Sequence, residues 1–273
     1  MNSSAWKRVG VALAAAVVVT GLAGCQDGDG GTKTSGASAG PATQSREEAA
    51  KAVRAAYTRT AEAKSAKVEM RVVVGGAQGG SSTFTGVQGW SPSVADLKVT
   101  DSTYLAGIPG APAETRMLTA DGVTYMDVGA EQAARTGGKR WMKVEAEGAL
   151  GGDELVTQLT AGLSGVNRDP AQELGLLAGS SEVKHLGPVK GGGAGGERYA
   201  GELSGGRRVE VWIGADGYPA RMIVRTTAGG APTTLTTDYS AYGSEAAVQA
   251  PPAEDTFGFM ELLKNLGAGL GQG

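Results

Sequence analysis

The sequence predicts an α+β fold: a single large curved antiparallel sheet, a half-barrel of about eleven strands, with helices covering its concave face. Two observations lead to this prediction. A helical segment precedes two blocks of short segments in which apolar and polar residues alternate, and two more helical segments lie between the blocks. Glycine-containing turns join most consecutive strands, and strands joined by tight turns pair in an antiparallel manner. No internal repeat indicates a propeller or a solenoid.

The first helix is predicted from about Ser45 to Ala63. Ser45 and Glu48 match a capping box, in which the serine hydroxyl accepts from the amide three residues on and the glutamate reaches back to the serine amide. Small apolar residues then recur at helical spacing. This stripe of small residues favours close packing against a flat surface, and a sheet is the expected partner.

Six strands are predicted in the block that follows. In the first of them every second residue from Val68 to Val74 is apolar, which is typical of a strand with one buried face. Asp121-Gly122 is the strongest hairpin signal, because a type I′ turn needs positive φ at both central positions, and its register places Leu118 opposite Tyr125. The strands of this block are expected at residues 67–74, 82–90, 93–101, 114–120, 123–127 and 140–145.

Two helices are predicted between the two blocks of strands. In residues 153–163 the leucines Leu155, Leu159 and Leu163 are spaced four apart, which indicates one apolar helix face. Asp169-Pro170 is typical of an N-cap followed by proline at the first helical position. The second block of strands is expected at residues 182–189, 197–203, 207–213, 220–227 and 233–242.

The first residues of the chain have the pattern of an export signal. The basic pair Lys7-Arg8 precedes an apolar run, Val9 to Thr20, that is short for a membrane span, and small residues follow it. The ending Leu-Ala-Gly-Cys resembles the lipobox of bacterial lipoproteins. The resemblance implies cleavage between Gly24 and Cys25 and acylation of the thiol of Cys25, the one cysteine in the chain. An ordinary secretory signal with a chance cysteine after the cleavage site is the alternative.

These patterns divide the chain into four parts. Residues 1–24 are the predicted signal peptide, and residues 25–44 are the lipidated cysteine with a Gly- and Ser-rich flexible tether. The half-barrel domain is expected over residues 45–255. Residues 256–273 are predicted to form a short amphipathic helix, beginning at Phe257, and a frayed tail.

Composition argues against several classes of function. The net charge of −3 and the scattered basic residues give no electrostatic basis for nucleic-acid binding. One cysteine and one histidine are too few for the common metal sites or for disulfides within the domain, so neither a metal nor a cofactor is expected. His185 is predicted to be a half-exposed strand residue. With no nucleophile and base in a recognisable pattern, the chain is not expected to be an enzyme.

Several stretches together resemble the actinobacterial lipoproteins of the LppX/LprG type, which share the half-barrel of the LolA and LolB carriers. These stretches are the lipobox, the capped first helix and residues 139–144, 211–219, 239–243 and 248–252. The resemblance implies an apolar cavity between sheet and helices that holds acyl chains, and transport of lipids or glycolipids across the envelope. The leucines of residues 153–163 would then form part of the lid.

The expected function is therefore that of an envelope lipoprotein, anchored by Cys25 at the extracytoplasmic face of the cell membrane, that binds a lipid, a glycolipid or another hydrophobic ligand and carries it across the cell wall. The alternative is a non-carrier: an interaction or sensory domain with a filled core that engages an envelope protein whose identity the sequence does not give. The candidate cavity residues are Val72, Val74, Leu118, Leu155, Leu159, Leu163, Val211 and Met222.

Overall fold

The computed structural model describes residues 44–76, 79–106, 110–145, 165–189, 195–228 and 230–259. The chain divides into two units, residues 1–39 and 40–273, and all the described residues belong to the second. The predicted signal peptide, Cys25, the predicted helix over 153–163 and most of the tether lie outside the described residues.

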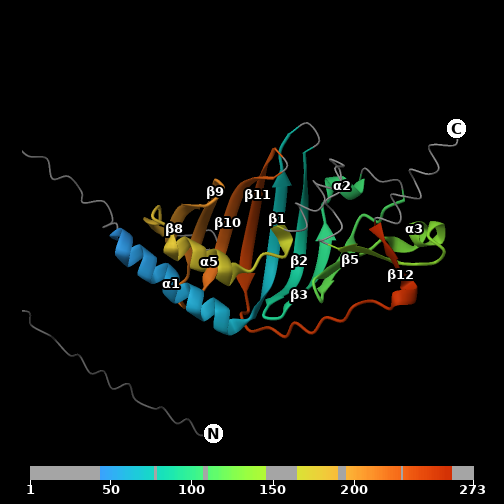
Figure 1. Cartoon of the computed structure of the whole chain (residues 1–273), viewed down its shortest axis with the longest axis horizontal. Coiled ribbons are helices and arrows are strands. Elements are labelled where there is room, and N and C mark those ends of the chain that lie inside the picture. Colours follow the sequence, from blue (N-terminus) through green and yellow to red (C-terminus); the bar gives the residue numbers. More distant parts are fainter. Residues whose placement is uncertain are drawn as a thin grey trace, which may run out of the picture. The chain divides into compact units, whose positions relative to one another are not determined.

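The described strands form one curved sheet in the order β12-β6-β5-β4-β3-β2-β1-β11-β10-β9-β8-β7 (Figure 1). Two antiparallel meanders, β1 to β6 and β7 to β11, therefore meet where β1 pairs with β11. The predicted fold class is confirmed. The strands are β1 Ser65–Val74, β2 Gly80–Trp90, β3 Ser93–Thr100, β4 Thr115–Ala120, β5 Val123–Asp127, β6 Trp141–Glu145, β7 Lys184–Val189, β8 Gly196–Leu203, β9 Arg207–Ile213, β10 Pro219–Ala228, β11 Ala231–Ser240 and β12 Thr256–Gly258.

All eleven predicted strands are present, with bounds within two residues of the prediction. The predicted hairpin is also confirmed, because Asp121 and Gly122 both have positive φ, at 52° and 77°. Its register opposes Leu118 and Tyr125, as expected. Local alternation and turn chemistry were thus sufficient to predict most of the sheet.

The twelfth strand was not predicted. Residues Thr256 to Gly258 form β12, which pairs with β6 and is the one parallel strand pair in the described sheet. The prediction of a helix beginning at Phe257 is wrong for Phe257 and Gly258, and residues from 260 on lie outside the described residues. Three residues are too short to show alternation, and burial of Phe257 against the sheet decides the outcome.

Four α-helices are described: α1 Arg46–Ala63, α2 Thr103–Ala106, α3 Gly129–Arg135 and α5 Pro170–Gly179, with a 3₁₀ turn at Ala253–Asp255. The short helices α2 and α3 were not predicted. Both predicted caps are confirmed. The hydroxyl of Ser45 accepts from the amide of Glu48 at 3.3 Å while the glutamate accepts from the amide of Ser45 at 2.8 Å. At α5, a carboxylate oxygen of Asp169 accepts from the amide of Ala171 at 2.7 Å.

Buried apolar side chains form two clusters on the inner face of the sheet, the face that carries α1 and α5. Cluster 1 lies under α1 and α5, which pack together over β8, β9 and β10 (Figure 1). Cluster 2 lies on β1 to β6, and Tyr239 of β11 packs against both. Cluster 1 contains Ala49, Val53, Ala56, Leu174, Leu177, Ala178, Val183, Tyr199, Leu203, Val209, Val211, Met222 and Val224. Cluster 2 contains Val68, Met70, Val72, Phe84, Ala95, Leu97, Val99, Met117, Val144, Val166 and Leu235.

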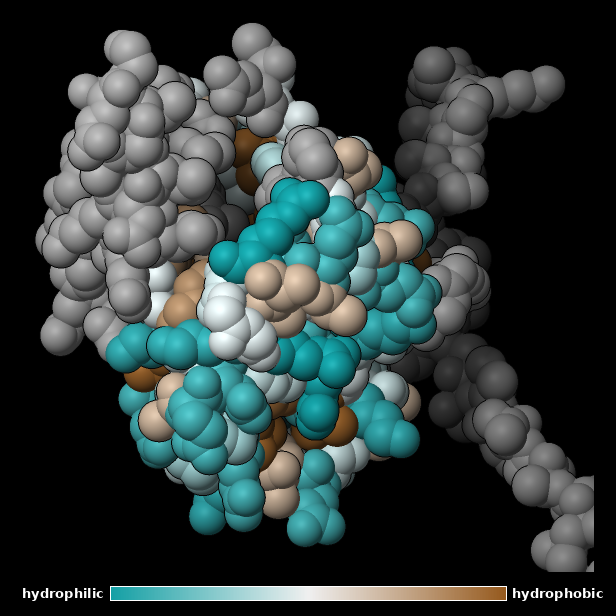
Figure 2. All heavy atoms as spheres, turned by 90° about the vertical axis from the view of Figure 1, so that its right-hand side faces the viewer, coloured by the Kyte–Doolittle hydropathy of each residue, from teal (hydrophilic) through white to brown (hydrophobic). Residues whose placement is uncertain are grey.

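The surface at one end of the molecule is largely hydrophilic. Figure 2 shows the end of the molecule that carries α3 and β12, where hydrophilic residues cover most of the described surface and hydrophobic ones appear in small separate areas. Among the described residues no helix is long and apolar enough to cross a membrane.

Candidate ligand site between the sheet and helix α5

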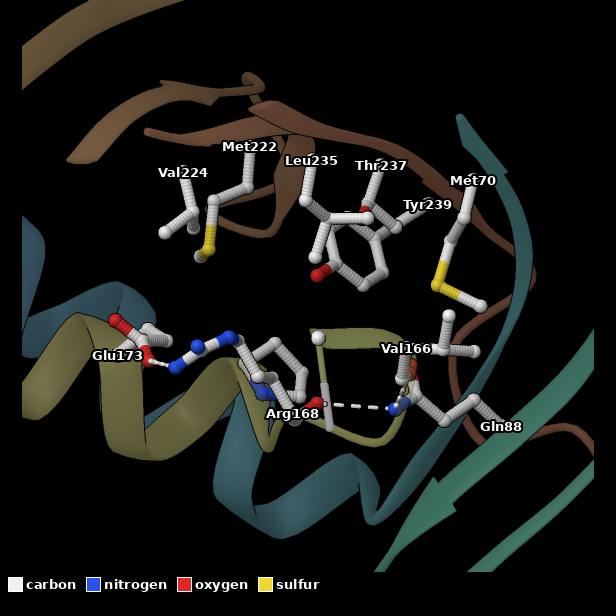
Figure 3. Close-up of a pocket in the computed structure, with 12 residues that line it drawn as sticks. Met70, Gln88, Val166, Arg168, Glu173, Met222, Val224, Leu235, Thr237 and Tyr239 are labelled. Carbon is white, nitrogen blue, oxygen red and sulfur yellow. Dashed lines mark hydrogen bonds and ion pairs between the residues drawn. The ribbon is translucent and has the colours of Figure 1, made fainter. Parts of the chain in front are cut away.

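A small pocket lies where the two clusters meet, between the sheet and the start of α5 (Figure 3). Its volume is about 10 Å³, which is the space of about one water molecule. The pocket as it stands is therefore too small for an acyl chain. It is lined by Met70, Gln88, Gly165, Val166, Arg168, Pro170, Glu173, Met222, Val224, Leu235, Thr237 and Tyr239.

One wall of the pocket is the segment of residues 165–169, here called the strap, which leads into α5. The buried side chain of Gln88 on β2 holds it, because its amide nitrogen donates to the carbonyl oxygens of Val166 at 3.1 Å and Arg168 at 2.9 Å (Figure 3). Val166 itself is fully packed in cluster 2. The strap is thus fixed to the sheet by one polar and one apolar side chain.

Asn167 of the strap makes a second polar attachment, to strands β4 and β5. Its side-chain oxygen accepts from the hydroxyl of Thr119 on β4 at 3.0 Å, and its nitrogen donates to the hydroxyl of Thr124 on β5 at 3.1 Å. Both threonines are buried. Buried polar groups must be hydrogen-bonded, so these bonds specify where the strap crosses the inner face.

The polar end of the pocket is a buried carboxylate between two arginines. The side chain of Glu173, in the first turn of α5, is 4% exposed. Its two oxygens lie 3.3 Å from Nη1 of Arg168 and 3.5 Å from Nη2 of Arg207 on β9. Among the described residues, Oε2 of Glu173 and Nε of Arg207 are buried without a hydrogen-bond partner. The polar end therefore has unused hydrogen-bonding capacity.

Aromatic residues close the pocket on its other side. Tyr239 lines the pocket, and its ring lies 6.1 Å from that of Tyr242, which stacks on Tyr218 at 4.3 Å. Burial raises the pKa of Tyr239 and of Tyr242 far above the ordinary value for tyrosine, so both hydroxyls stay neutral at physiological pH. Trp90 meets Tyr242 edge to face at 6.2 Å and donates to the carbonyl of Thr60, which connects this group to the end of α1.

A separate polar contact joins the end of the predicted tether to the sheet. Nδ1 of His185 accepts from the backbone amide of Gln44 at 3.1 Å, and Nε2 lies 2.5 Å from a carboxylate oxygen of Glu197. The hydroxyl of Tyr199 donates to the side chain of Gln44 at 3.2 Å, and burial raises the pKa of Tyr199. The prediction of a half-exposed His185 is wrong, because its strand position faces inward and only 7% of it is exposed.

No family model matches the chain. The chain is 26% identical over 296 residues to the Streptomyces coelicolor protein named "Putative lipoprotein SCO4650", and the alignment covers 98% of this chain and 100% of that protein. The similarity therefore extends over the full length of a protein whose name describes it as a lipoprotein. Among solved structures, lipoprotein LppX of Mycobacterium tuberculosis matches 75% of this chain and 100% of its own, with 13% identity and a TM-score of 0.47. LprF from Mycobacterium bovis matches 78% of this chain and 99% of its own, with 15% identity and a TM-score of 0.41.

Of the predicted cavity residues, Met222 lines the pocket. Val72 and Val74 lie on β1, the first within cluster 2 and the second packed against it. Val211 is fully buried in cluster 1, opposite Met222 in the register of β9 and β10. The structure therefore brings Val211 and Met222 together and places the two β1 valines in the neighbouring cluster.

Leu118 was predicted to line the cavity. This prediction is wrong, because Leu118 lies on the other face of the sheet. Its neighbour Met117 belongs to cluster 2 on the inner face, and successive residues of a strand point to opposite faces. Leu118 is nevertheless buried, on the outer side, which is why hydrophobicity alone suggested it. The candidates Leu155, Leu159 and Leu163 lie outside the described residues.

Sequence reasoning missed the polar residues of the site. Gln88 carried a usable signal, because it is polar at a position that shares its strand face with Phe84, an inward-facing core residue. An amide at an inward position predicts a buried hydrogen-bond network. Glu173 was hidden, since an acidic residue in the first turn of a helix is explained by the helix dipole without a partner.

Proposed function

We propose that this protein is a lipoprotein of the cell envelope, anchored by acyl groups on Cys25 at the extracytoplasmic face of the cell membrane. Two observations support the proposal: the lipobox pattern around the single cysteine and the full-length similarity to a protein named as a lipoprotein. The absence of a membrane-spanning helix among the described residues is compatible with attachment through a lipid.

The described domain binds a hydrophobic ligand, such as a lipid or glycolipid, between the sheet and α5, and hands it on across the envelope. The observation that carries this proposal is the position of the pocket at the junction of two separate apolar clusters. Met70, Met222 and Leu235 line that junction, and methionine side chains adapt easily to a changed cavity shape. Rearranging these side chains would extend the pocket into the clusters without breaking the sheet.

A second candidate is an interaction or sensory domain that binds no lipid. The small volume of the pocket supports it, because a core with space for about one water molecule is a filled core. In this case the strap and the two helices present a fixed surface to an envelope protein.

Native mass spectrometry of the full chain with Cys25→Ser distinguishes the two candidates. This variant carries no acyl groups of its own, so any acyl lipid that copurifies is a bound ligand. Carrier function predicts a bound lipid in the gently purified protein and uptake of a fluorescent lipid by the delipidated protein. A well-folded protein that does neither would exclude the carrier and leave the interaction domain.

A pair of variants tests the position of the ligand. Met222→Trp places a larger side chain in the pocket and is expected to abolish lipid uptake. Met126→Trp is the matched control, because Met126 is a partly buried methionine that packs against cluster 2 without lining the pocket. Equal uptake by both variants would place the ligand elsewhere.

A further inference from the structure

The polar end of the pocket suggests the chemical class of the ligand, provided that the proposed ligand binding holds. Arg168 and Arg207 share the single carboxylate of Glu173, at 3.3 and 3.5 Å. Each guanidinium has five N–H donors. A single carboxylate, with two oxygens, cannot accept from all the donors of two guanidinium groups. Each arginine therefore keeps donors for another acceptor, and the buried Nε of Arg207 has no hydrogen-bond partner among the described residues.

The two arginines are also accessible, in contrast to the carboxylate between them. The side chains of Arg168 and Arg207 are 28% and 21% exposed, whereas that of Glu173 is 4% exposed. Glu173 thus positions both guanidinium groups; Arg168 lines the pocket itself, and Arg207 lies next to the pocket on the other oxygen of the same carboxylate. Arg168 lines the pocket on the side of α5 and lies across it from Met222 and Val224 of β10, so a cationic wall faces an apolar one (Figure 3).

The other charged group nearby does not cancel this arrangement. Asp169 is the N-cap of α5, and one of its oxygens accepts from the amides of Ala171 and Gln172 at 2.7 and 3.2 Å. Its charge is therefore used mainly in capping the helix. Arg168, Arg207 and Glu173 together carry one net positive charge, and the carboxylate of Asp169 is matched by the field at the start of α5.

We propose that the ligand is an anionic amphiphile. Its acyl part enters the junction of the two clusters beside Met70, Met222 and Leu235, and its phosphate or carboxylate headgroup lies between Arg168 and Arg207. The headgroup accepts the guanidinium donors that Glu173 leaves unused, which is the geometry in which arginine binds phosphate and carboxylate well.

Calorimetric titration of the full chain with Cys25→Ser tests this with three soluble probes: dioctanoyl phosphatidate, dioctanoylglycerol and inorganic phosphate. The two lipids have the same acyl chains and differ in the anionic group. Phosphatidate is expected to bind at least about tenfold more tightly than dioctanoylglycerol, since hydrogen bonds to charged groups are the stronger class. Inorganic phosphate alone is expected to bind far more weakly than phosphatidate.

Three other outcomes would contradict either this inference or the proposed function. Equal affinity for the two lipids would overturn the anionic ligand and leave the proposed function standing. If neither lipid binds, the proposed function itself fails. Phosphate binding as tight as phosphatidate binding would show a free-anion site and overturn the amphiphile. This comparison uses the unmodified pocket, so it does not depend on the folding of any pocket variant.

Arginine variants then locate the headgroup. Arg168→Gln and Arg207→Gln are each expected to lower phosphatidate affinity about tenfold and to leave dioctanoylglycerol binding unchanged. Arg208→Gln is the matched control, because Arg208 is the next residue on β9, points to the opposite face and pairs with Glu202 there. A loss with Arg208→Gln as large as with Arg207→Gln would contradict the assignment.

Discussion

The hydrogen bonds of His185 determine which of its ring nitrogens carries the proton. Because Nδ1 accepts from the amide of Gln44, the neutral ring must be protonated at Nε2, and that proton is donated to Glu197. The histidine thereby attaches the start of α1 to β7 and β8. It fixes Gln44, the last residue of the predicted tether, against the sheet.

Nitrogen-15 NMR of the histidine ring tests this assignment without ambiguity, since the chain has one histidine. We expect the neutral ring to show the chemical shifts of the Nε2–H tautomer. The variant Gln44→Pro removes the donating amide and should allow both tautomers. The Nδ1–H tautomer in the unmodified protein would contradict the contact with Gln44.

Gln88 is a second residue whose replacement is expected to lower the stability of the protein, because it holds the strap. Replacing Gln88 with Leu keeps a side chain of similar size but leaves the carbonyls of Val166 and Arg168 without their donor. We expect a loss of about 2–4 kcal/mol in the free energy of unfolding. Denaturant unfolding measures it, with Gln172→Leu on the exposed side of α5 as the control, expected to change stability by less than about 0.5 kcal/mol. Similar losses in the two variants would show that the strap is not held by Gln88.

At the scale of elements, the sequence predicted what is encoded locally. The capping box of α1, the Asp169-Pro170 start of α5 and the Asp121-Gly122 hairpin each depend on residues at most four apart. The attachment of the strap to three strands and the pairing of β12 with β6 depend on residues far apart in the chain, and alternation gives a face but no partner. The pocket could not be predicted for the same reason.

The capping box of α1 gives a prediction about both stability and pH. Ser45→Ala should lower the free energy of unfolding by about 1 kcal/mol, the usual loss for a serine N-cap. Thermal unfolding measures it, with Thr58→Ala on the exposed side of the same helix as the control. A loss in Thr58→Ala equal to that in Ser45→Ala would contradict a specific cap.

The same box makes the stability depend on acid. The backbone amide and hydroxyl of Ser45 donate to Glu48 and lower the pKa of Glu48 below its usual 4.5. A carboxyl whose pKa is lower in the folded state stabilises at neutral pH, and this contribution is lost as the pH falls through that lowered pKa. Glu48→Gln should therefore unfold more easily than the unmodified protein at pH 7 and equally easily in strong acid. A stability difference that persists unchanged into strong acid would exclude this linkage.

For the molecule as a whole, the anchor proposed at Cys25 would limit how the domain can act. A Gly- and Ser-rich coil of about twenty residues has a root-mean-square span of about 25 Å. A domain on the predicted tether would therefore stay close to the membrane, so loading, handover or sensing would be local. One acyl chain binds membranes only marginally, and stable anchoring requires a second signal, such as a second acyl chain.

Replacing Cys25 with Ser tests the anchor. We expect the variant to be released into the medium or to remain unprocessed, which fractionation of cells and medium followed by mass spectrometry would reveal. Ser35→Ala, within the predicted tether, is the control and should stay with the membrane. If the Cys25→Ser protein is cut at the same place and still partitions into detergent, Cys25 is not the anchor.

The position of β1 has a consequence for the order in which the protein folds. β1 comes first among the strands in the chain but lies between β2 and β11 in the sheet. A chain that emerges from its N-terminus can complete the meander from β1 to β6 early, yet the other edge of β1 stays unpaired until residues 231–240 arrive. Such a long-range pairing is slow, and an open apolar strand edge invites association with other chains. The nascent protein therefore keeps its central strand exposed along one edge until β11 has been synthesised.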